Sequence, residues 1–206
     1  MRTATHGAAR TWIESGLWML AVVGLGFWTF AQWSAWNYQR EAARQLATTP
    51  LAARSPQRRL SAGEPLGHLS VPRLDLDVVV AEGDSAGVLR RAVGHVPRSA
   101  LPGMEGNVVL AGHRDTFFRP LRETRAGDII RFATPRKTYT YRVQWTKVVS
   151  PSDVKVMQPV PASGDAHPGV LTLITCYPFY YVGPAPKRFV VRALPVDATR
   201  AQGAGE

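Results

Sequence analysis

The chain has 206 residues, which is enough for one domain of ordinary size and an appendage. A content of 45% hydrophobic and 19% charged residues is typical of a globular protein and excludes a disordered chain. Because Cys176 is the only cysteine, an intrachain disulfide and a zinc site built on cysteine pairs are both excluded. The net charge of +10 fits a nucleic-acid partner, an anionic membrane surface, or an arginine-rich composition without a special partner.

A long uncharged stretch follows the short N-terminal flank at residues 1–15. No charged residue occurs between positions 16 and 36, a length close to the roughly 20 residues that cross a bilayer core as a helix. Aromatic rings favour membrane interfaces, and most of the tryptophans lie in or beside this stretch: Trp12, Trp18, Trp28, Trp33 and Trp36. We therefore predict a transmembrane anchor helix at 16–38. A cleaved signal peptide is the alternative, because 29–31 (TFA) offers small residues at a suitable spacing.

The charges on either side of this stretch bear on the orientation of the anchor. Arg2 and Arg10 precede it, together with Glu14. More arginines follow it: Arg40, Arg44, Arg54, Arg58 and Arg59. Taken alone, the positive-inside rule predicts that the C-terminal domain is cytoplasmic.

Residues 39–65 contain Ala, Arg, Ser, Thr and Pro and almost no large apolar side chains, so they cannot form a core. We interpret them as a stalk, which can be helical at its start. From residue 66 the pattern changes to short apolar runs separated by Gly, Pro and Asp. These runs predict strands at 66–71, 74–80, 107–113, 128–134, 137–149, 170–176 and 188–194.

The longest predicted strand shows the period of two. In 139–145, Tyr, Tyr, Val and Trp alternate with Thr, Arg and Gln, which places one face on a core and the other in water. Helical signals are scarce and limited to 85–92 and a turn near 117–121. About seven or eight short strands of this kind predict an all-β domain at 66–196, either a closed barrel or a sandwich, before a flexible tail at 197–206.

The lone thiol, Cys176, ends a strand-like run (TLITC). Free cysteine is among the most buried residue types, so burial as a small apolar side chain is the ordinary interpretation. In an extended strand, however, Thr172, Ile174 and Cys176 point to one face, and the pair Tyr177-Pro178 ends the strand at once. We therefore expect Cys176 at the rim of the domain, where a nucleophile can meet a substrate.

Arg188 begins the next predicted strand. A hairpin would make its guanidinium a near cross-strand neighbour of Cys176. A cation beside a thiol favours the thiolate, and a fixed donor can stabilise the oxyanion formed when a thiolate attacks a carbonyl, an interaction worth ~3 to 4 kcal/mol in comparable donor deletions. The alternative for Arg188 is an ordinary surface charge.

Amide cleavage also needs a proton carrier, and the 5 histidines compete for this role. His6 precedes the membrane stretch and His167 lies in a Pro/Gly-rich segment, so both are weaker candidates. His68 and His95 fall within apolar runs, where structural hydrogen bonding is the default. His113 follows Gly112 at the end of an apolar run, where another strand leaves the core. It is our candidate for the general acid and base.

Two segments carry a family resemblance: 106–121 (GNVVLAGHRDTFFRPL) and 172–191 (TLITCYPFYYVGPAPKRFVV). They resemble the sortases, which are membrane-anchored cysteine transpeptidases, and are most similar to the class D branch. The Thr-Leu-x-Thr-Cys signature is matched at 172–176, the Gly-His element at 112–113, and the basic partner at Arg188. An N-terminal anchor followed by a stalk is also the sortase layout.

The resemblance implies a closed eight-stranded sortase-type β-barrel with short helices, preceded by one transmembrane helix. It implies that Cys176 is the nucleophile, His113 the general acid/base, and Arg188 the residue that stabilises the oxyanion or orients the substrate. Thr175 and Tyr177 would belong to the substrate-binding groove.

The reaction implied is cleavage of a C-terminal sorting signal similar to Leu-Pro-x-Thr-Gly or Leu-Pro-x-Thr-Ala after its Thr, through a Cys176 thioester that an amine resolves. The proline-containing segment 150–169 would grip the Leu-Pro part of the signal. The partners would be secreted proteins with this signal and an amine acceptor, a peptidoglycan precursor or a pilin lysine, outside the cytoplasmic membrane. We expect no cofactor: some sortases bind calcium, but the candidate acidic residues are scattered, namely Asp75, Asp77, Glu82 and Asp84.

Three other functions are alternatives. A membrane-anchored cysteine protease would resolve the same thioester with water. An inactive sortase-like binding domain predicts the loss of a residue of the triad, and none is lost. Nucleic-acid binding depends on the net charge alone, since no recognition helix or aromatic RNA motif accompanies it.

Overall fold

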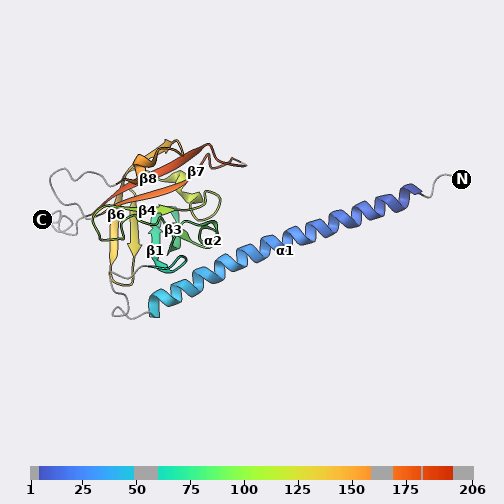
Figure 1. Ribbon diagram of the computed structural model, residues 1–206, viewed down its shortest axis with the longest axis horizontal. Coiled ribbons are helices and arrows are strands. Elements are labelled where there is room, and N and C mark those ends of the chain that lie inside the picture. Colours follow the sequence, from blue (N-terminus) through green and yellow to red (C-terminus); the bar gives the residue numbers. More distant parts are fainter. Residues whose placement is uncertain (1–4, 49–59, 159–168, 182, 197–206) are drawn as a thin grey trace.

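The structure is a computed structural model, which describes residues 5–48, 60–158, 169–181 and 183–196. Its strands form a closed barrel in the order β1-β2-β3-β4-β7-β8-β6-β5, and a long helix, α1, runs beside the barrel and beyond it (Figure 1). The strands are β1 (Pro65–Val71), β2 (Leu76–Glu82), β3 (Val93–His95), β4 (Asn107–Ala111), β5 (Ile129–Ala133), β6 (Thr138–Val149), β7 (Val170–Tyr177) and β8 (Lys187–Pro195). The helices are α1 (Thr5–Thr48), η2 (Pro72–Leu74), α2 (Ala86–Leu89), η3 (Arg119–Glu123) and η4 (Val154–Met157). The predicted eight-stranded barrel is confirmed, and the sandwich alternative is wrong.

Alternate residues of the strands fill the barrel interior. In β7, Leu171, Leu173 and Thr175 point inward, and both leucines are fully buried. Val191 and Ala193 of the neighbouring strand β8 belong to the same core cluster. Burying a Leu or Val side chain is worth about 1.5–3 kcal/mol, so these residues determine which face of β7 meets solvent.

Two predicted elements have different boundaries in the structure. The strand expected from residue 74 begins later, because Pro72 opens the 3-10 turn η2 and Asp75 ends it with a left-handed φ of 49°. The helix expected at 85–92 is the shorter α2, whose N-cap is Ser85.

The short strand β3 was not predicted from the sequence. It joins parallel to β2 and antiparallel to β4, through the pairs Val80 with Val93 and Gly94 with Ala111. A Cβ at Gly94 would lie 2.3 Å from the carbonyl oxygen of Gly83, so the backbones approach too closely for any larger residue. A strand of 3 residues is too short to show a readable alternation.

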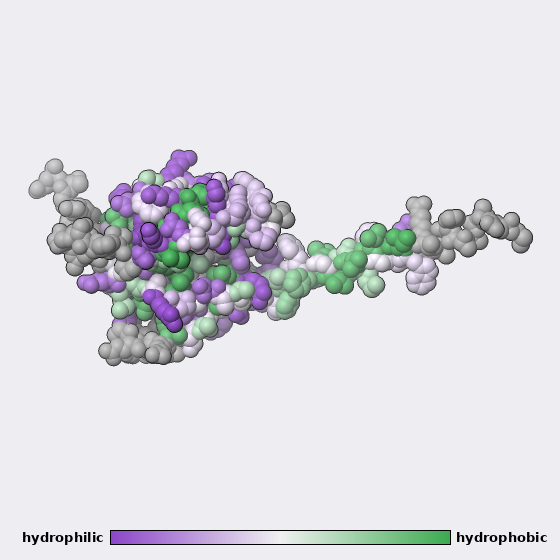
Figure 2. Space-filling model, turned by 45° about the horizontal axis from the view of Figure 1, so that its top comes forward, coloured by the Kyte–Doolittle hydropathy of each residue, from purple (hydrophilic) through white to green (hydrophobic). Residues whose placement is uncertain are grey.

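Helix α1 is longer than the predicted anchor at 16–38. Its part Trp12–Thr48 is long and apolar enough to cross a membrane. The large apolar side chains on it are exposed, as the green stretch beyond the barrel in Figure 2 shows; Trp18 and Phe27 are 73% and 74% exposed. Such a surface is suited to lipid and not to water.

The predicted stalk at 39–65 falls into parts with different structures. Its first residues, to Thr48, are the last turns of α1, and its last residue opens β1. Residues 49–59 lie outside the described residues, as does the predicted tail at 197–206.

Gln39, in the last part of α1, forms hydrogen bonds with backbone groups of the barrel that no neighbouring strand satisfies. Its side-chain amide accepts a hydrogen bond from the N–H of Val79 (2.8 Å) and donates one to the carbonyl of Arg91 (2.6 Å). Val79 is fully buried in β2, which pairs with β3 only from Val80 onward. A buried N–H needs a partner, and Gln39 supplies it across the gap.

Two neighbours of Gln39 strengthen this attachment. The hydroxyl of Tyr38 donates to the carbonyl of Gly63 (2.7 Å), and the guanidinium of Arg91 lies 5.3 Å from the centre of the Tyr38 ring. Ala42 is 3% exposed. We call Tyr38, Gln39 and Ala42 the anchor clasp, because they fasten α1 to the barrel.

The strand directions define two ends of the barrel. β4 and β7 run parallel, so both finish at one end, which we call the Cys176 end. β3 is antiparallel to β4 and parallel to β2, so β2 and β3 begin there. β6 runs in the direction of β7, because both are antiparallel to β8, so the β5–β6 turn lies at the opposite end.

An ion pair joins two segments at the Cys176 end. Arg73 of η2 donates from Nε and Nη2 to the two carboxylate oxygens of Asp128, at 2.6 and 2.7 Å. The same Nη2 reaches the carbonyl of Glu123 at 2.5 Å. The hydrogen bond from Arg73 holds the pKa of the Asp128 carboxyl below its usual range, although burial alone would raise it.

Replacing Gln39 with Ala should lower the free energy of unfolding of the full-length protein by about 1–3 kcal/mol, because the buried N–H of Val79 loses its acceptor. Thermal unfolding in detergent micelles, followed by circular dichroism, measures this loss. Gln45→Ala is the control, since Gln45 is exposed on the same helix, and it should change stability by no more than about 0.5 kcal/mol. Equal losses in both variants would contradict a stabilising clasp.

Candidate active site

Cys176 and Arg188 face each other across the β7–β8 hairpin. They are paired residues in the antiparallel register, so their side chains leave the same face of the sheet. Because Leu173 and Thr175 point into the barrel, Cys176 points outward, and its thiol is free and partly exposed. The expected position at a strand end is observed, since β7 finishes at Tyr177.

The parallel pairing of β4 with β7 places His113 beside them. Ala111 pairs with Ile174, and the N–H of Gly112 donates to the Ile174 carbonyl at 3.2 Å. His113 and Cys176 each follow this pair by two residues, so the end of β4 and the loop that carries His113 lie beside the end of β7 that carries Cys176. Since β4, β7 and β8 are neighbours in the barrel, the three predicted site residues occupy adjacent strand ends.

Thr175 has a different place from the one that the resemblance implies. Its side chain is 2% exposed, and its hydroxyl donates to the carbonyl of Gly112 at 2.7 Å. Thr175 therefore does not line an open groove, because the alternation of β7 turns it into the barrel. It holds the residue before His113 against the strand that carries Cys176.

Gly112 itself is required by close packing. A Cβ at this position would lie 2.7 Å from the ring of Phe118, which is fully buried. The N–H of Phe118 in turn donates to the carbonyl of His113 at 3.0 Å. The loop that carries His113 is thus fixed from both sides.

Arg114 is a structural residue of this site that the sequence analysis did not select. Its Nη2 donates to the carbonyls of Tyr181 and Gly183, the second at 3.3 Å. It therefore ties the His113 loop to the loop between β7 and β8. The signal in the sequence was only its position next to His113, which says nothing about a partner so far along the chain.

The guanidinium of Arg188 has nitrogens that its hydrogen bonds within the described residues do not use. Among the described residues its hydrogen bonds use Nη1 alone, which donates to the carbonyls of Ala185 (3.1 Å) and Lys187 (3.0 Å). These bonds hold the side chain in place. Nε and Nη2 are then the donors that a negatively charged oxygen near Cys176 can use.

Tyr177 lies in an aromatic cluster at the Cys176 end. Its ring centre is 6.1 Å from that of Phe179 and 6.4 Å from that of Phe189. These distances are typical of favourable ring contacts. The assignment of Tyr177 to the substrate-binding groove stays a prediction.

His95 shows a triad-like arrangement that is structural. Its Nδ1 lies 2.7 Å from a carboxylate oxygen of Glu82, and its Nε2 lies 2.9 Å from the hydroxyl of Ser99. The same Nε2 is 3.0 Å from the carbonyl of Ala100, and the Ser99 hydroxyl donates to the Val96 carbonyl at 2.7 Å. With His95 2% exposed and the hydroxyl already committed, this network stabilises the barrel and offers no nucleophile.

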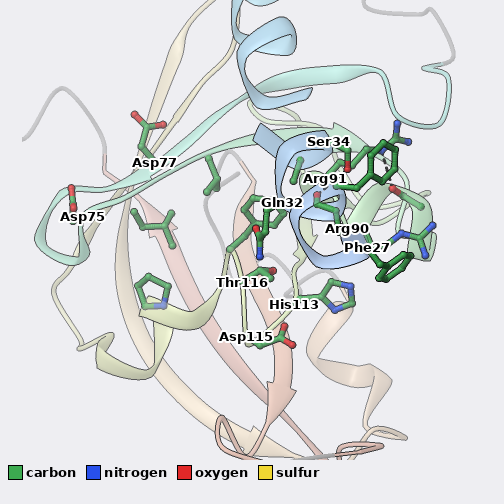
Figure 3. Close-up of a pocket in the computed structure, with 18 residues that line it drawn as sticks. Phe27, Gln32, Ser34, Asp75, Asp77, Arg90, Arg91, His113, Asp115 and Thr116 are labelled. Atoms are coloured by element: carbon green, nitrogen blue, oxygen red, sulfur yellow. Dashed lines mark hydrogen bonds between the residues drawn. The ribbon is translucent and has the colours of Figure 1, made fainter. Parts of the chain in front are cut away.

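A cleft of about 1000 Å³ lies between α1 and the barrel and reaches His113 (Figure 3). Phe27 and Ser34 belong to its helix wall, and Arg90 and His113 belong to its barrel wall. Within the described residues the His113 ring makes no side-chain hydrogen bond. Its nitrogens are therefore available for proton transfer.

Buried polar side chains support the loop between β6 and β7. Asn107 donates from Nδ2 to the carbonyls of 156–158 at 3.0–3.3 Å and accepts from the Thr172 hydroxyl at 2.7 Å. Arg192 donates from Nη2 to one of these carbonyls at 2.7 Å, and burial lowers the pKa of its guanidinium. The sequence analysis missed both residues, although polar side chains within apolar runs were the signal. The remainder of this predicted substrate loop, 159–168, lies outside the described residues.

Two of the acidic residues considered for calcium pair with different histidines. Asp77 lies 3.3 Å from Nδ1 of His68, and Glu82 pairs with His95. In the described part of the chain, no group of three His, Cys, Asp or Glu side chains could hold a metal ion.

Comparison with known proteins points to one family. The sequence profile of the sortase domain matches residues 69–196. Sortase D of Bacillus subtilis is 34% identical over 152 residues, which cover 74% of this chain and 74% of the relative.

Solved structures show the same fold. A sortase D5 transpeptidase of Clostridium perfringens superposes with a TM-score of 0.66 at 23% identity, over 79% of this chain and 98% of that chain. Sortase C of Clostridium perfringens, solved with the C-terminal cell wall sorting motif, has a TM-score of 0.60 at 24% identity, over 80% of this chain and 88% of that chain.

Thr175→Val should shift the imidazole NMR signals of His113 and lower the free energy of unfolding by about 1–3 kcal/mol, because the Gly112 carbonyl loses its buried donor while the side-chain shape is kept. Proton–nitrogen spectra of histidine-labelled protein measure the shift. Thr138→Val, at an exposed position on β6, is the control and should leave the His113 signals in place. Unmoved His113 signals in Thr175→Val would remove the positioning role.

Proposed function

The chain belongs to the sortase family of cysteine transpeptidases, and we propose that Cys176, His113 and Arg188 are its catalytic residues. The observation that supports this proposal is the register of β4, β7 and β8: Cys176 pairs with Arg188, and the end of β4, which His113 follows, lies beside β7. Their chemical types supply a nucleophile, a proton carrier and an oxyanion donor. The reaction needs no cofactor beyond these groups.

In the first half of the reaction, the Cys176 thiolate attacks the carbonyl carbon of the scissile amide. Arg188 donates to the oxyanion that forms, through the nitrogens that its loop bonds leave for a ligand. When the C–N bond breaks, protonated His113 gives its proton to the leaving amine. The acyl group then remains on Cys176 as a thioester.

In the second half, an amine attacks the thioester carbonyl, and neutral His113 takes the proton that the amine loses. The C–S bond breaks and returns Cys176 to the thiolate. The product is a new amide between the substrate and the acceptor. Water in place of the amine gives hydrolysis, which is the reaction of the protease alternative.

The substrates follow from the family. The sortase C of Clostridium perfringens was solved with the C-terminal cell wall sorting motif. For this chain we infer that secreted proteins with a Leu-Pro-x-Thr-Gly-like or Leu-Pro-x-Thr-Ala-like signal are cleaved after the Thr. The acceptor amine belongs to a peptidoglycan precursor or a pilin lysine.

Cys176→Ala should abolish cleavage of Leu-Pro-x-Thr-x peptides by the full-length protein in detergent micelles, because no thioester forms. His113→Ala should lower kcat by about 10²- to 10⁴-fold, and Arg188→Lys by about 10²- to 10³-fold. His68→Ala is the control. His68 pairs with Asp77 on another part of the barrel, so this variant should cleave the peptides at the wild-type rate.

Added hydroxylamine separates the possible functions, with mass spectrometry of the products as the measurement. A transpeptidase should yield the hydroxamate of the Thr fragment. Cleavage without any amine-trapped product indicates a protease, and a wild-type protein that cleaves no peptide of the library indicates a binding domain. Cleavage that survives Cys176→Ala would contradict the assigned nucleophile.

The proposed location of the barrel is the extracytoplasmic side of the cytoplasmic membrane. The single thiol tests it directly, because Cys176 is the only labelling site in the chain. A membrane-impermeant maleimide should label Cys176 in intact cells from which the cell wall has been removed. Labelling that requires lysis of the membrane would instead support the cytoplasmic location that the flanking arginines predict.

A further inference from the structure

Helix α1 passes the Cys176 end of the barrel before it reaches the anchor clasp. Phe27 and Ser34 line the cleft with Arg90 and His113, which lie at the Cys176 end. The clasp follows later in the helix: Gln39 binds Val79 and Arg91, and Tyr38 binds Gly63, just before β1 begins at the opposite end. The apolar part of α1 therefore leaves the barrel at the Cys176 end. In Figure 1 it extends to the same side of the barrel as the tip of the β7–β8 hairpin.

The same geometry sets the depth of the Cys176 end relative to a bilayer. Trp36 ends the apolar stretch, and Arg40 lies 3.6 Å from the centre of its ring, which is the pairing expected at a membrane interface. From Phe27 to Trp36 an α-helix rises roughly 14 Å. The headgroup layer on each side of a bilayer is roughly 5 to 8 Å thick. Phe27 therefore lies deeper than this layer, whereas Gln32 and Ser34 lie within roughly 6 Å of Trp36, so the barrel residues beside Gln32 and Ser34 reach the depth of the lipid headgroups.

The Cys176 end carries exposed tyrosines. Tyr180 and Tyr181, in the loop between β7 and β8, are 81% and 45% exposed. Arg122 donates to the Tyr180 hydroxyl at 3.1 Å, and the guanidinium of Arg114 lies 5.8 Å from the centre of the Tyr181 ring. Tyrosine rings prefer the membrane interface, where the ring meets apolar chains and the hydroxyl meets water.

Exposed basic side chains at this end outnumber the exposed acidic ones. They are Arg90, Arg91, Arg119, Arg122, Arg125 and Lys187, against Asp75, Asp77, Asp115 and Glu123. Glu123 lies 3.2 Å from Arg122, and without this pair five basic residues stand against three acidic ones. Each arginine near an anionic bilayer contributes about fivefold to its association, so a positive surface at headgroup depth favours lipid phosphates.

We propose that the Cys176 end of the barrel rests on the anionic headgroups of the bilayer that holds α1. Tyr180 and Tyr181 enter the interface, and Arg90, Arg119 and Arg122 contact lipid phosphates. We call these five residues the membrane-facing rim. The anchor clasp prevents the barrel from turning away, so Cys176 meets its substrates at the membrane surface. The anionic headgroups thereby balance part of the net charge of +10.

The test uses the full-length protein in nanodiscs, in a Cys176→Ala background, so that it does not depend on the proposed reaction. Tyr180→Cys carries an environment-sensitive fluorophore at the rim. Arg136→Cys carries the same fluorophore at the opposite end, in the exposed β5–β6 turn. The quencher is a phospholipid with a nitroxide on its headgroup, in discs of either phosphatidylglycerol with phosphatidylcholine or phosphatidylcholine alone.

We expect the nitroxide to quench the label at position 180 several-fold more strongly than the label at 136. Removal of phosphatidylglycerol, or the charge reversal Arg90→Glu with Arg119→Glu, should reduce quenching at 180. Arg98→Glu, exposed on the loop after β3, is the matched control and should not reduce it.

Equal quenching at 180 and 136 would overturn the proposal. So would quenching at 180 that does not respond to anionic lipid or to the charge reversal. Shielding of the label at 180 that appears only with an added substrate protein, and without lipid quenching, would assign the rim to a protein partner and also overturn it.

Discussion

The parallel pairing of β4 with β7 is the constraint on which the site depends. Ala111 opposite Ile174 brings the loop of His113 beside the end of β7 that carries Cys176, and a slip of one residue would turn every side chain of one strand to the other face. Two buried contacts at the strand end hold this register. The Thr175 hydroxyl binds the Gly112 carbonyl, and the absence of a side chain at Gly112 makes room for the Phe118 ring.

A second constraint acts between the barrel and the membrane helix. Because β2 and β3 begin to pair only at Val80, the N–H of Val79 is left to a side chain, and the Gln39 amide of α1 fills the gap. Because α1 is attached through backbone groups of the barrel wall, its direction relative to the barrel is fixed. That direction carries the apolar part of α1 past the Cys176 end.

Elements with strong local signals could be predicted, and elements defined by their neighbours could not. The alternation in β6 and the end of β7 at Tyr177 are visible in the sequence, so the strand, the rim position of Cys176 and its pairing with Arg188 followed. β3 has 3 residues and exists only because its neighbours pair with it. The inward direction of Thr175 was readable, but its partner Gly112 belongs to a distant part of the chain. For this reason its role changed from binding substrate to positioning His113.

The sequence by itself determined the chemical types at the site, the apolar anchor and the all-β character of the domain, because these depend on composition and on the period of side chains along the strands. Only the tertiary structure decided that the loop of His113 lies beside Cys176 and Arg188, that Arg114 ties two loops together, and that α1 runs past the Cys176 end of the barrel. The physical reason is that such contacts depend on strand register and on hydrogen bonds between residues far apart in the chain, which no local pattern specifies.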